Sequence, residues 1–317
     1  MRWNKIGKIF DPSIHKLPNE CKDFAQSPQA IVFEDFVRVY FSTRAKDPLE
    51  GMYLSHVAFV DLTLDLRSLI RVSDHEIIPL GELGAFDEHG IFPFHVVRRG
   101  NEIHAYTNGW SRRISVPVET GVGLAISRNN GETFTRQGVG PVISATLHEP
   151  YLVGDAFVRV FNDKLHMWYI YGTAWRRQTK DTAPERTYKI GHAVSDNGID
   201  WRKDEGKQII PDILGLDESQ ALPTVIELEG GYLMAFCFRQ TFDFRSNSKR
   251  SYKIGFAWSE DLVNWTRNDS FGHLGTDDWD SEMQCYPHLF RVDEKIYLLY
   301  NGNEFGKTGF GGATLVL

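Results

Sequence analysis

Acidic residues recur at one spacing from a repeated proline. An acid stands five residues before each of four prolines that open apolar segments: Asp23 before Pro28, Glu88 before Pro93, Glu218 before Pro223 and Glu282 before Pro287. A fifth segment, GDAFVRVF (154–161), has Ala156 in the proline position, with Asp155 directly before it and Glu149 a little earlier. Carboxylates that converge raise one another's pKa, which supplies a proton donor beside a carboxylate base. The alternative is that each acid accepts hydrogen bonds from backbone amides and serves the scaffold.

A second set of residues follows the next strand signal in each repeat. These loops read STRAKD (Arg44), TNGWSRR (Trp110, Arg112), YGTAWRR (Trp175, Arg176), CFRQTFDFR (Arg239) and NGNEFG (Asn301). Aromatic rings beside hydrogen-bonding groups suit a sugar, which has apolar faces and hydroxyl edges. Arginines add recognition of a carboxylate or phosphate. The alternative for each arginine is a solvated loop charge.

Repeated elements must position these residues. The proline positions follow one another at 63 to 67 residues, and each begins a run of three strand signals. A tight Ser-to-aromatic turn then leads to a fourth strand, as in SDNGIDW (195–201) and SEDLVNW (259–265), which lie 64 residues apart. Fourth strands are expected at 134–143, 201–210 and 265–274, with the aromatic residue packed between neighbouring units.

This period predicts an all-β fold, a single five-bladed β-propeller with four antiparallel strands per blade. The last unit lacks a fourth strand, which WNKIGKIF (3–10) supplies with Trp3 in the aromatic position, so that the N-terminal strand closes the last blade and protects its edge. The blades are expected at about 23–80, 88–146, 149–214, 218–275 and 282–317 plus 1–12 within one domain, 1–317. First strands line the central channel of a propeller, and the pocket lies at one mouth.

Composition excludes several classes of protein. The 317 residues carry a net charge of −7, which argues against nucleic acid and anionic membranes as partners. No apolar run approaches the roughly 20 residues of a membrane span, and the N-terminus lacks a signal-peptide core. The three cysteines, Cys21, Cys237 and Cys285, are scattered, so free thiols and a cytoplasmic location are expected.

Eleven histidines raise the question of a metal. No HExxH or comparable spacing occurs, and no phosphate loop, dinucleotide fingerprint or nucleophile elbow occurs either. No metal and no cofactor are therefore expected. His288, next to Pro287, is either a core histidine or a channel residue that holds a water or a hard cation.

With these features the chain resembles the five-bladed propeller glycosidases, glycoside hydrolase families 32, 43, 117 and 130 and their uncharacterised relatives. The resemblance implies an Asp in blade one, an Asp in blade three and a Glu in blade four. Asp155 and Glu218 match the last two, whereas Ser27 stands where the blade-one Asp is expected and Asp23 lies earlier. The chain also looks like propeller proteins that accompany bacterial surface-glycan biosynthesis. The Ser-Asp-x-Gly-x-x-Trp turn is similar to the sialidase Asp box, but five units are counted here and not six.

The leading hypothesis is a glycoside hydrolase, inverting in mechanism, that acts on an anionic sugar. Glu218 is expected to be the general acid and Asp23 the base, while Asp155 orients the sugar and modulates the acid. The remaining expected substrate-binding residues are Glu88, His89, Glu282, Arg44, Trp110, Arg112, Trp175, Arg176, Arg239, His288 and Asn301. The partner is then a small molecule or an oligosaccharide. Three alternatives stay open: a phosphorylase, in which arginines bind phosphate, a non-catalytic glycan-binding propeller, and a protein-interaction platform.

Overall fold

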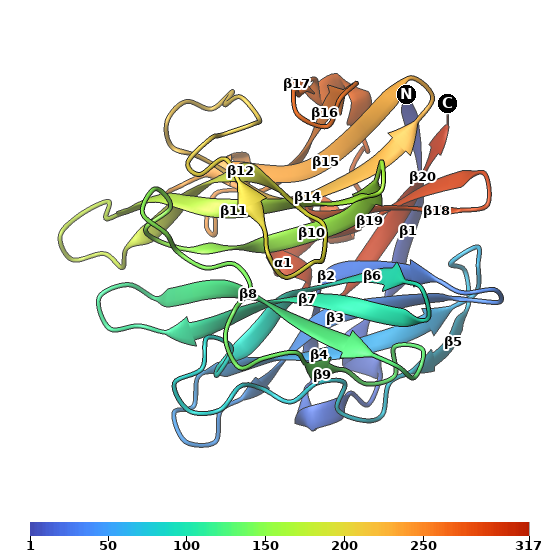
Figure 1. The fold of residues 1–317 in the computed structure, drawn as a ribbon, viewed down its shortest axis with the longest axis horizontal. Helices are drawn as coiled ribbons and strands as arrows, with labels where there is room; N and C mark the ends of the chain where they lie inside the picture. The colour runs from blue at the N-terminus through green and yellow to red at the C-terminus, as the bar shows by residue number, and fades with distance from the viewer. Residues whose placement is uncertain (317) are drawn as a thin grey trace.

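The computed structural model describes residues 1–316 as an all-β chain built from antiparallel sheets, as the sequence predicts (Figure 1). Two sheets contain four strands in sequence order. One comprises β10 (Val153–Phe161), β11 (Lys164–Arg176), β12 (Glu185–Ser195) and β13 (Arg202–Lys203). The other comprises β14 (Glu218–Leu228), β15 (Gly231–Gln240), β16 (Lys253–Ser259) and β17 (Thr266–Arg267).

An eight-stranded sheet consists of two further sets of four strands. The first set is β2 (Asp23–Val32), β3 (Val37–Lys46), β4 (Tyr53–Leu62) and β5 (Leu69–Val72). The second set is β6 (Gly90–Arg99), β7 (Glu102–Arg112), β8 (Val118–Ser127) and β9 (Thr135–Arg136). A single parallel pairing, Ser55 with Gly90, joins them.

The two ends of the chain share the remaining sheet. It contains β18 (Cys285–Val292), β19 (Lys295–Asn301), β20 (Phe310–Val316) and the N-terminal strand β1 (Arg2–Phe10), which pairs antiparallel with β20 (Figure 1). In sequence order of their first strands, we call the five sets of four strands units 1 to 5. Helical segments are short: η1 (Pro12–Ile14), η2 (Pro18–Glu20), η3 (Ser248–Arg250), η4 (Asp269–Gly272), η5 (Asp278–Asp280) and α1 (Asn303–Gly306).

The repeated Ser-to-aromatic turn packs units 2, 3 and 4 each against the preceding unit, and Trp3 of β1 packs unit 5 against unit 4. The Ser195 hydroxyl accepts hydrogen bonds from the amides of Asn197 and Gly198, which fixes the turn. The ring of Trp201 then meets Tyr106 of unit 2 edge-on, with 5.7 Å between centroids. The other aromatic residues follow the same rule: Phe134 meets Tyr40, Trp265 meets Trp168 and Trp3 meets Phe256. The expected scaffold role of this turn is confirmed.

The expected length of the fourth strands is wrong. β9, β13 and β17 each contain only two residues, whereas strands of about ten residues were expected. Gly138, Gly140 and Pro141 interrupt the first of these segments, and Pro cannot donate to a strand ladder. The outer strands must therefore be held by other interactions.

Buried ion pairs hold the outer strands of four units. Each pair joins a carboxylate at most 1% exposed to a base two residues after the turn aromatic: Asp87 to Arg136, Glu149 to Lys203, Glu218 to Arg267 and Asp280 to Lys5. The acid lies at or just before the first strand, and the base lies on the fourth strand of the same unit. Each pair thus links the first strand of a unit to its fourth strand.

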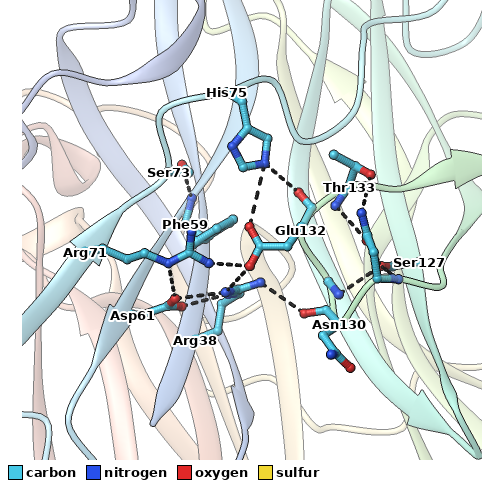
Figure 2. A network of polar contacts seen from close by, with 12 residues as sticks. Arg38, Phe59, Asp61, Arg71, Ser73, His75, Ser127, Asn130, Glu132 and Thr133 are labelled. Atoms are coloured by element: carbon cyan, nitrogen blue, oxygen red, sulfur yellow. Dashed lines mark hydrogen bonds and ion pairs between the residues drawn. The ribbon is translucent and has the colours of Figure 1, made fainter.

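Unit 1 uses a different arrangement on its outer strand (Figure 2). The guanidinium of Arg38 donates two hydrogen bonds to Asp61, at 2.7 and 2.8 Å, and stacks on Phe59 at 3.9 Å. Arg71 of β5 also bonds Asp61, and both arginines bond Glu132 in the turn of unit 2. This network joins units 1 and 2, and none of these residues lines the cavity described below.

Replacing Arg267 with Met should lower the free energy of unfolding by about 3–5 kcal/mol, because the buried Glu218 carboxylate loses its counter-ion. The measurement is the urea midpoint of the full chain. The double variant Glu218→Met/Arg267→Met should recover most of the loss. Arg98→Met, at an exposed arginine without an ion pair in residues 1–316, should change stability by at most about 0.5 kcal/mol. Equal midpoints for Arg267→Met and Arg98→Met would contradict a stabilising pair.

Candidate active site in the shared cavity

A cavity of about 730 Å³ opens where the first strands begin and the second strands end. All five units contribute to its wall, for example through Gln26, Trp110, Asp155, Arg239 and Tyr286. Its wall combines aromatic rings, amides, arginines and few carboxylates. This composition fits the expectation of a sugar-binding pocket.

A break in strand register recurs at one point of every first strand. The pairing with the second strand skips the same two positions in every unit, at Ser27, Phe92, Asp155, Leu222 and Tyr286 and the residue after each. Four of these five residues have positive φ, between 47° and 57°, and Phe92 precedes a cis proline. Of the five, Phe92, Asp155 and Tyr286 line the cavity, and only Asp155 carries an acid.

Asp155 is a buried carboxyl group at the cavity wall, with 8% of its surface exposed. Burial raises the pKa of Asp155 to about 7, while the nearby Arg186 guanidinium and Leu222 amide oppose this rise. A carboxyl group with this pKa is partly protonated at neutral pH and can donate a proton. The residue assigned to an orienting role from the sequence thus has the properties of an acid.

Glu218, the expected general acid, does not line the cavity. It is fully buried and bonds Arg267 at 2.6 Å and the amides of Ile213 and Leu214 at 2.8 Å. Burial alone would raise the pKa of Glu218, but hydrogen bonds from Gln220, the Ile213 amide and Arg267 outweigh it and lower the pKa. The assignment as an acid does not fit this environment, and the scaffold alternative describes it.

The other expected acids lie in different settings. Asp23 pairs in register with Arg44 at the start of β2 but is not part of the cavity wall. Glu88 also lies outside, where it accepts a hydrogen bond from the Gly84 amide. Glu282 is exposed and lines the cavity. The five-residue spacing therefore does not bring the acids together.

The expected arginines divide into two groups. Arg44 and Arg239 line the cavity. Arg112 instead bonds Asp47 at 3.0 Å and also Glu50, and Arg176 bonds Asp217. Neither of these two lines the cavity, because acids of neighbouring loops hold their guanidinium groups.

The remaining expected residues are mostly structural. Trp110 lines the cavity, and His89 stacks on it at 5.9 Å without reaching the wall. Trp175 packs on the core of units 3 and 4. His288 is 1% exposed, is not part of the cavity wall, and lies beside His95 and Phe157. The Asn301 side chain bonds the backbone of Ala25, Ser27 and Gly309, so it serves the scaffold.

Several wall residues were not predicted from the sequence. Tyr188 lies in β12 and Tyr252 directly precedes β16, and their hydroxyl groups bond each other across the 64-residue repeat. The repeated YKIG at these positions was a usable signal. Arg186 was missed because β12 begins at Glu185, three residues before that motif.

Five of the 17 buried polar side-chain atoms without a hydrogen-bond partner in residues 1–316 belong to residues of this wall. They are Gln26 Oε1, Arg44 Nε, Asn108 Oδ1, Ser251 Oγ and Arg239 Nε. Unpaired buried polar groups carry a free-energy cost, so they indicate positions where a ligand would bond. Amides and a hydroxyl group suit sugar hydroxyls, and guanidinium groups suit an anion.

No group of three or more His, Cys, Asp and Glu side chains in residues 1–316 is arranged to hold a metal ion. Within the same residues, every helix is too short or too polar to cross a membrane.

Two curated proteins resemble the whole chain. The "Uncharacterized protein Rv1502" and the "Uncharacterized protein MT1551" of two Mycobacterium tuberculosis strains are each 31% identical over 324 residues, covering 99% of this chain and 99% of the relative. No family model matches the sequence.

Solved structures resemble the fold. The structure of BT0996 in an RGII complex aligns with a TM-score of 0.69 at 17% identity, over 99% of this chain and 93% of the BT0996 chain. The β-1,2-mannobiose phosphorylase from Listeria innocua aligns at 0.67 and 11% identity, over 99% and 97%. A thermostable family-43 glycoside hydrolase aligns at 0.64 and 13% identity, over 94% and 91%. At these identities the likeness concerns the fold, which is that of the propeller glycosidases.

Asp155→Asn should stabilise the chain more at pH 8 than at pH 4. The pKa of Asp155 rises from 3.8 to about 7 on folding. Between these two pH values Asp155 is therefore protonated to a greater extent in the folded state than in the unfolded state. The neutral Asp155 carboxyl group therefore makes its full contribution to the free energy of unfolding below pH 3.8, and this contribution is lost as the pH rises through about 7. The measurement is the difference in melting temperature between variant and wild type across this range. A difference that does not change with pH would contradict the raised pKa.

Proposed function

Because this chain belongs to the family of the Mycobacterium tuberculosis proteins Rv1502 and MT1551 and has the fold of the propeller glycosidases, we propose that it is a glycan-active enzyme. Its proposed reaction is cleavage of a glycosidic bond in an anionic glycan. One observation carries the proposal: Asp155, the single acid among the five equivalent central positions, lies buried in a cavity rich in arginine. The solved neighbours named above include a hydrolase and a phosphorylase, which supports the reaction class.

We further propose that units 1 to 5 are the five blades of one propeller. The single Ser55–Gly90 pairing within the eight-stranded sheet supports its division into two blades. The pairing of β1 with β20 supports the N-terminal strand as the fourth strand of the last blade. In this arrangement the first strands surround the axis, and the cavity is the mouth of the channel.

Asp155 is the proposed general acid in place of Glu218. The glycosidic oxygen must receive a proton as the bond breaks, and a carboxyl with a pKa of about 7 supplies it near neutral pH. The aromatic rings of Phe92, Trp110 and Tyr286 border the same space and suit the apolar face of a sugar.

Hydrolysis with inversion needs a second carboxylate that activates water. Glu282 is the proposed base, because it lines the cavity and has no cationic partner in residues 1–316. Glu304 also lines the cavity but is paired with Lys307 at 3.1 Å. Asp23, the base expected from the sequence, lies outside the wall and is not retained.

Phosphorolysis is the second candidate, and a specific observation favours it. Arg44, Arg186 and Arg239 line the cavity without a carboxylate partner in the described residues, so they can bind a phosphate ion. Phosphate replaces water as the nucleophile, and no second carboxylate is then required. A cavity with one buried acid and these three guanidinium groups is consistent with this reaction.

Asp155→Asn should reduce turnover of an accepted acidic oligosaccharide by about 10²–10⁴-fold, the usual contribution of a general acid. The wild-type rate should fall as pH rises through about 7, because the acid form is then lost. The measurement is product release from a panel of acidic oligosaccharides, with and without inorganic phosphate. A requirement for phosphate would identify phosphorolysis, and turnover without it would identify hydrolysis.

The matched control is Asp196→Asn, which removes an exposed carboxylate in the turn of unit 3 and should leave turnover unchanged. Full turnover in Asp155→Asn would refute the proposed acid. Tight binding of a glycan without product release, either in the presence or in the absence of phosphate, would instead favour the non-catalytic glycan-binding alternative.

A further inference from the structure

Three arginines in the cavity differ from most other arginines of the chain. Arg44, Arg186 and Arg239 line the wall, and none has a carboxylate oxygen within 4.0 Å among residues 1–316. By contrast, the side chains of Arg38 and Arg267, at most 3% exposed, have carboxylate partners. Cationic groups left without counter-ions in a partly dehydrated pocket are positioned for an anionic ligand.

Arg44 forms one cationic end of the cavity. Its guanidinium lies over the ring of Phe24 at 4.7 Å and near that of Tyr53 at 5.8 Å, and its Nε has no acceptor in residues 1–316. Lys307 lines the same cavity but is paired with Glu304. Arg44 therefore offers the unpaired charge at this end.

Arg186 and Arg239 form the other end. Arg239 is 1% exposed and lies over Phe244 at 3.6 Å, which fixes the plane of its guanidinium. Its Nη atoms bond backbone carbonyl groups, including that of Arg186 at 3.5 Å, whereas its Nε has no acceptor in the described chain. Arg186 is the less constrained member of this pair, since its side chain makes no hydrogen bond within residues 1–316.

Aromatic rings lie beside both ends. Arg239 contacts the ring of Tyr252 at 5.5 Å, and Tyr252 meets Tyr286 with 5.6 Å between centroids. Tyr286 and Arg44 line the same cavity. Asp155 stands at the position of unit 3 equivalent to Tyr286 in unit 5. Arg44 and Arg239 thus rest on different aromatic rings, and the proposed acid lines the same cavity.

We infer that the cavity binds two oxyanions at once, one at Arg44 and one at Arg186 and Arg239. The identification of the ligand as a glycan rests on the proposed function. The two oxyanions are then acidic groups on either side of the glycosidic bond whose oxygen Asp155 protonates. Alternatively, one is an acidic group of the sugar and the other is a free phosphate ion. Both sources share the same chemistry, a planar or tetrahedral oxyanion held by guanidinium groups.

Titration calorimetry of the wild-type chain with inorganic phosphate should give two equivalents per chain. Arg44→Met and Arg186→Met should each bind one equivalent, because each loses a different site. Arg98→Met, which removes an exposed arginine outside the cavity wall, should still bind two. Melting temperatures equal to wild type would establish that both cavity variants are folded. One equivalent in the wild type, or loss of the same site in both variants, would overturn the inference.

The source of the second oxyanion follows from competition with two uronides. A digalacturonate that displaces both phosphate ions assigns both sites to the glycan. A galacturonate monomer that displaces one ion and leaves the other bound assigns the second site to phosphate. Displacement of both ions by the monomer would overturn two separate sites, and displacement of none by either uronide would overturn the acidic glycan as ligand.

These binding measurements do not depend on turnover. Two phosphate sites in a chain without glycosidic activity would refute the proposed function and leave the two anion sites intact. Turnover of an acidic glycan by a chain with one phosphate site would refute the present inference alone.

Discussion

The break in register within each first strand is the constraint on which the site depends. In every unit two consecutive residues of the first strand are left out of the pairing with the second strand. The first of these two residues is never glycine, yet it has positive φ in four of the five units. Such conformations persist only where the surrounding structure enforces them. The regular strands on both sides provide that enforcement. In units 2, 3 and 5 the first residue of this break lines the cavity, and Asp155 is the one that brings a carboxyl group there.

Charge is compensated differently in the scaffold and in the cavity. In the scaffold, Glu218 and Arg267 neutralise each other across unit 4, and equivalent pairs serve three other units. In the cavity, Arg239 rests on Phe244, has no carboxylate partner, and its Nε has no acceptor in residues 1–316. The same residue type therefore stabilises the fold in one place and, in the proposed function, binds the ligand in another.

Sequence patterns predicted the strand order and the packing of Trp201 and Trp265, because both depend on local periodicity. The five-residue spacing that singled out Glu218 did not mark a shared role, since the acids of the buried ion pairs are Asp87, Glu149, Asp280 and, alone among the acids so spaced, Glu218. The role of Glu218 depends on its partner, Arg267, which is 49 residues away and two positions after an aromatic. This pattern, an aromatic residue followed two positions later by a basic residue, can be recognised in the sequence. The site itself cannot, since the raised pKa of Asp155 arises from burial among several units.

The pairing of β1 with β20 has a consequence for how the chain is made. Lys5 meets Asp280 across 275 positions, so the first strand has no partner until nearly the whole polypeptide has emerged. At ordinary synthesis rates this wait lasts roughly 15–60 s. During that time an amphipathic strand with a free edge is exposed to other nascent chains. Lysine side chains on a free strand edge disfavour pairing with another chain, and β1 carries Lys5 and Lys8. In the folded chain the same two lysines form ion pairs with Asp280 and Asp11.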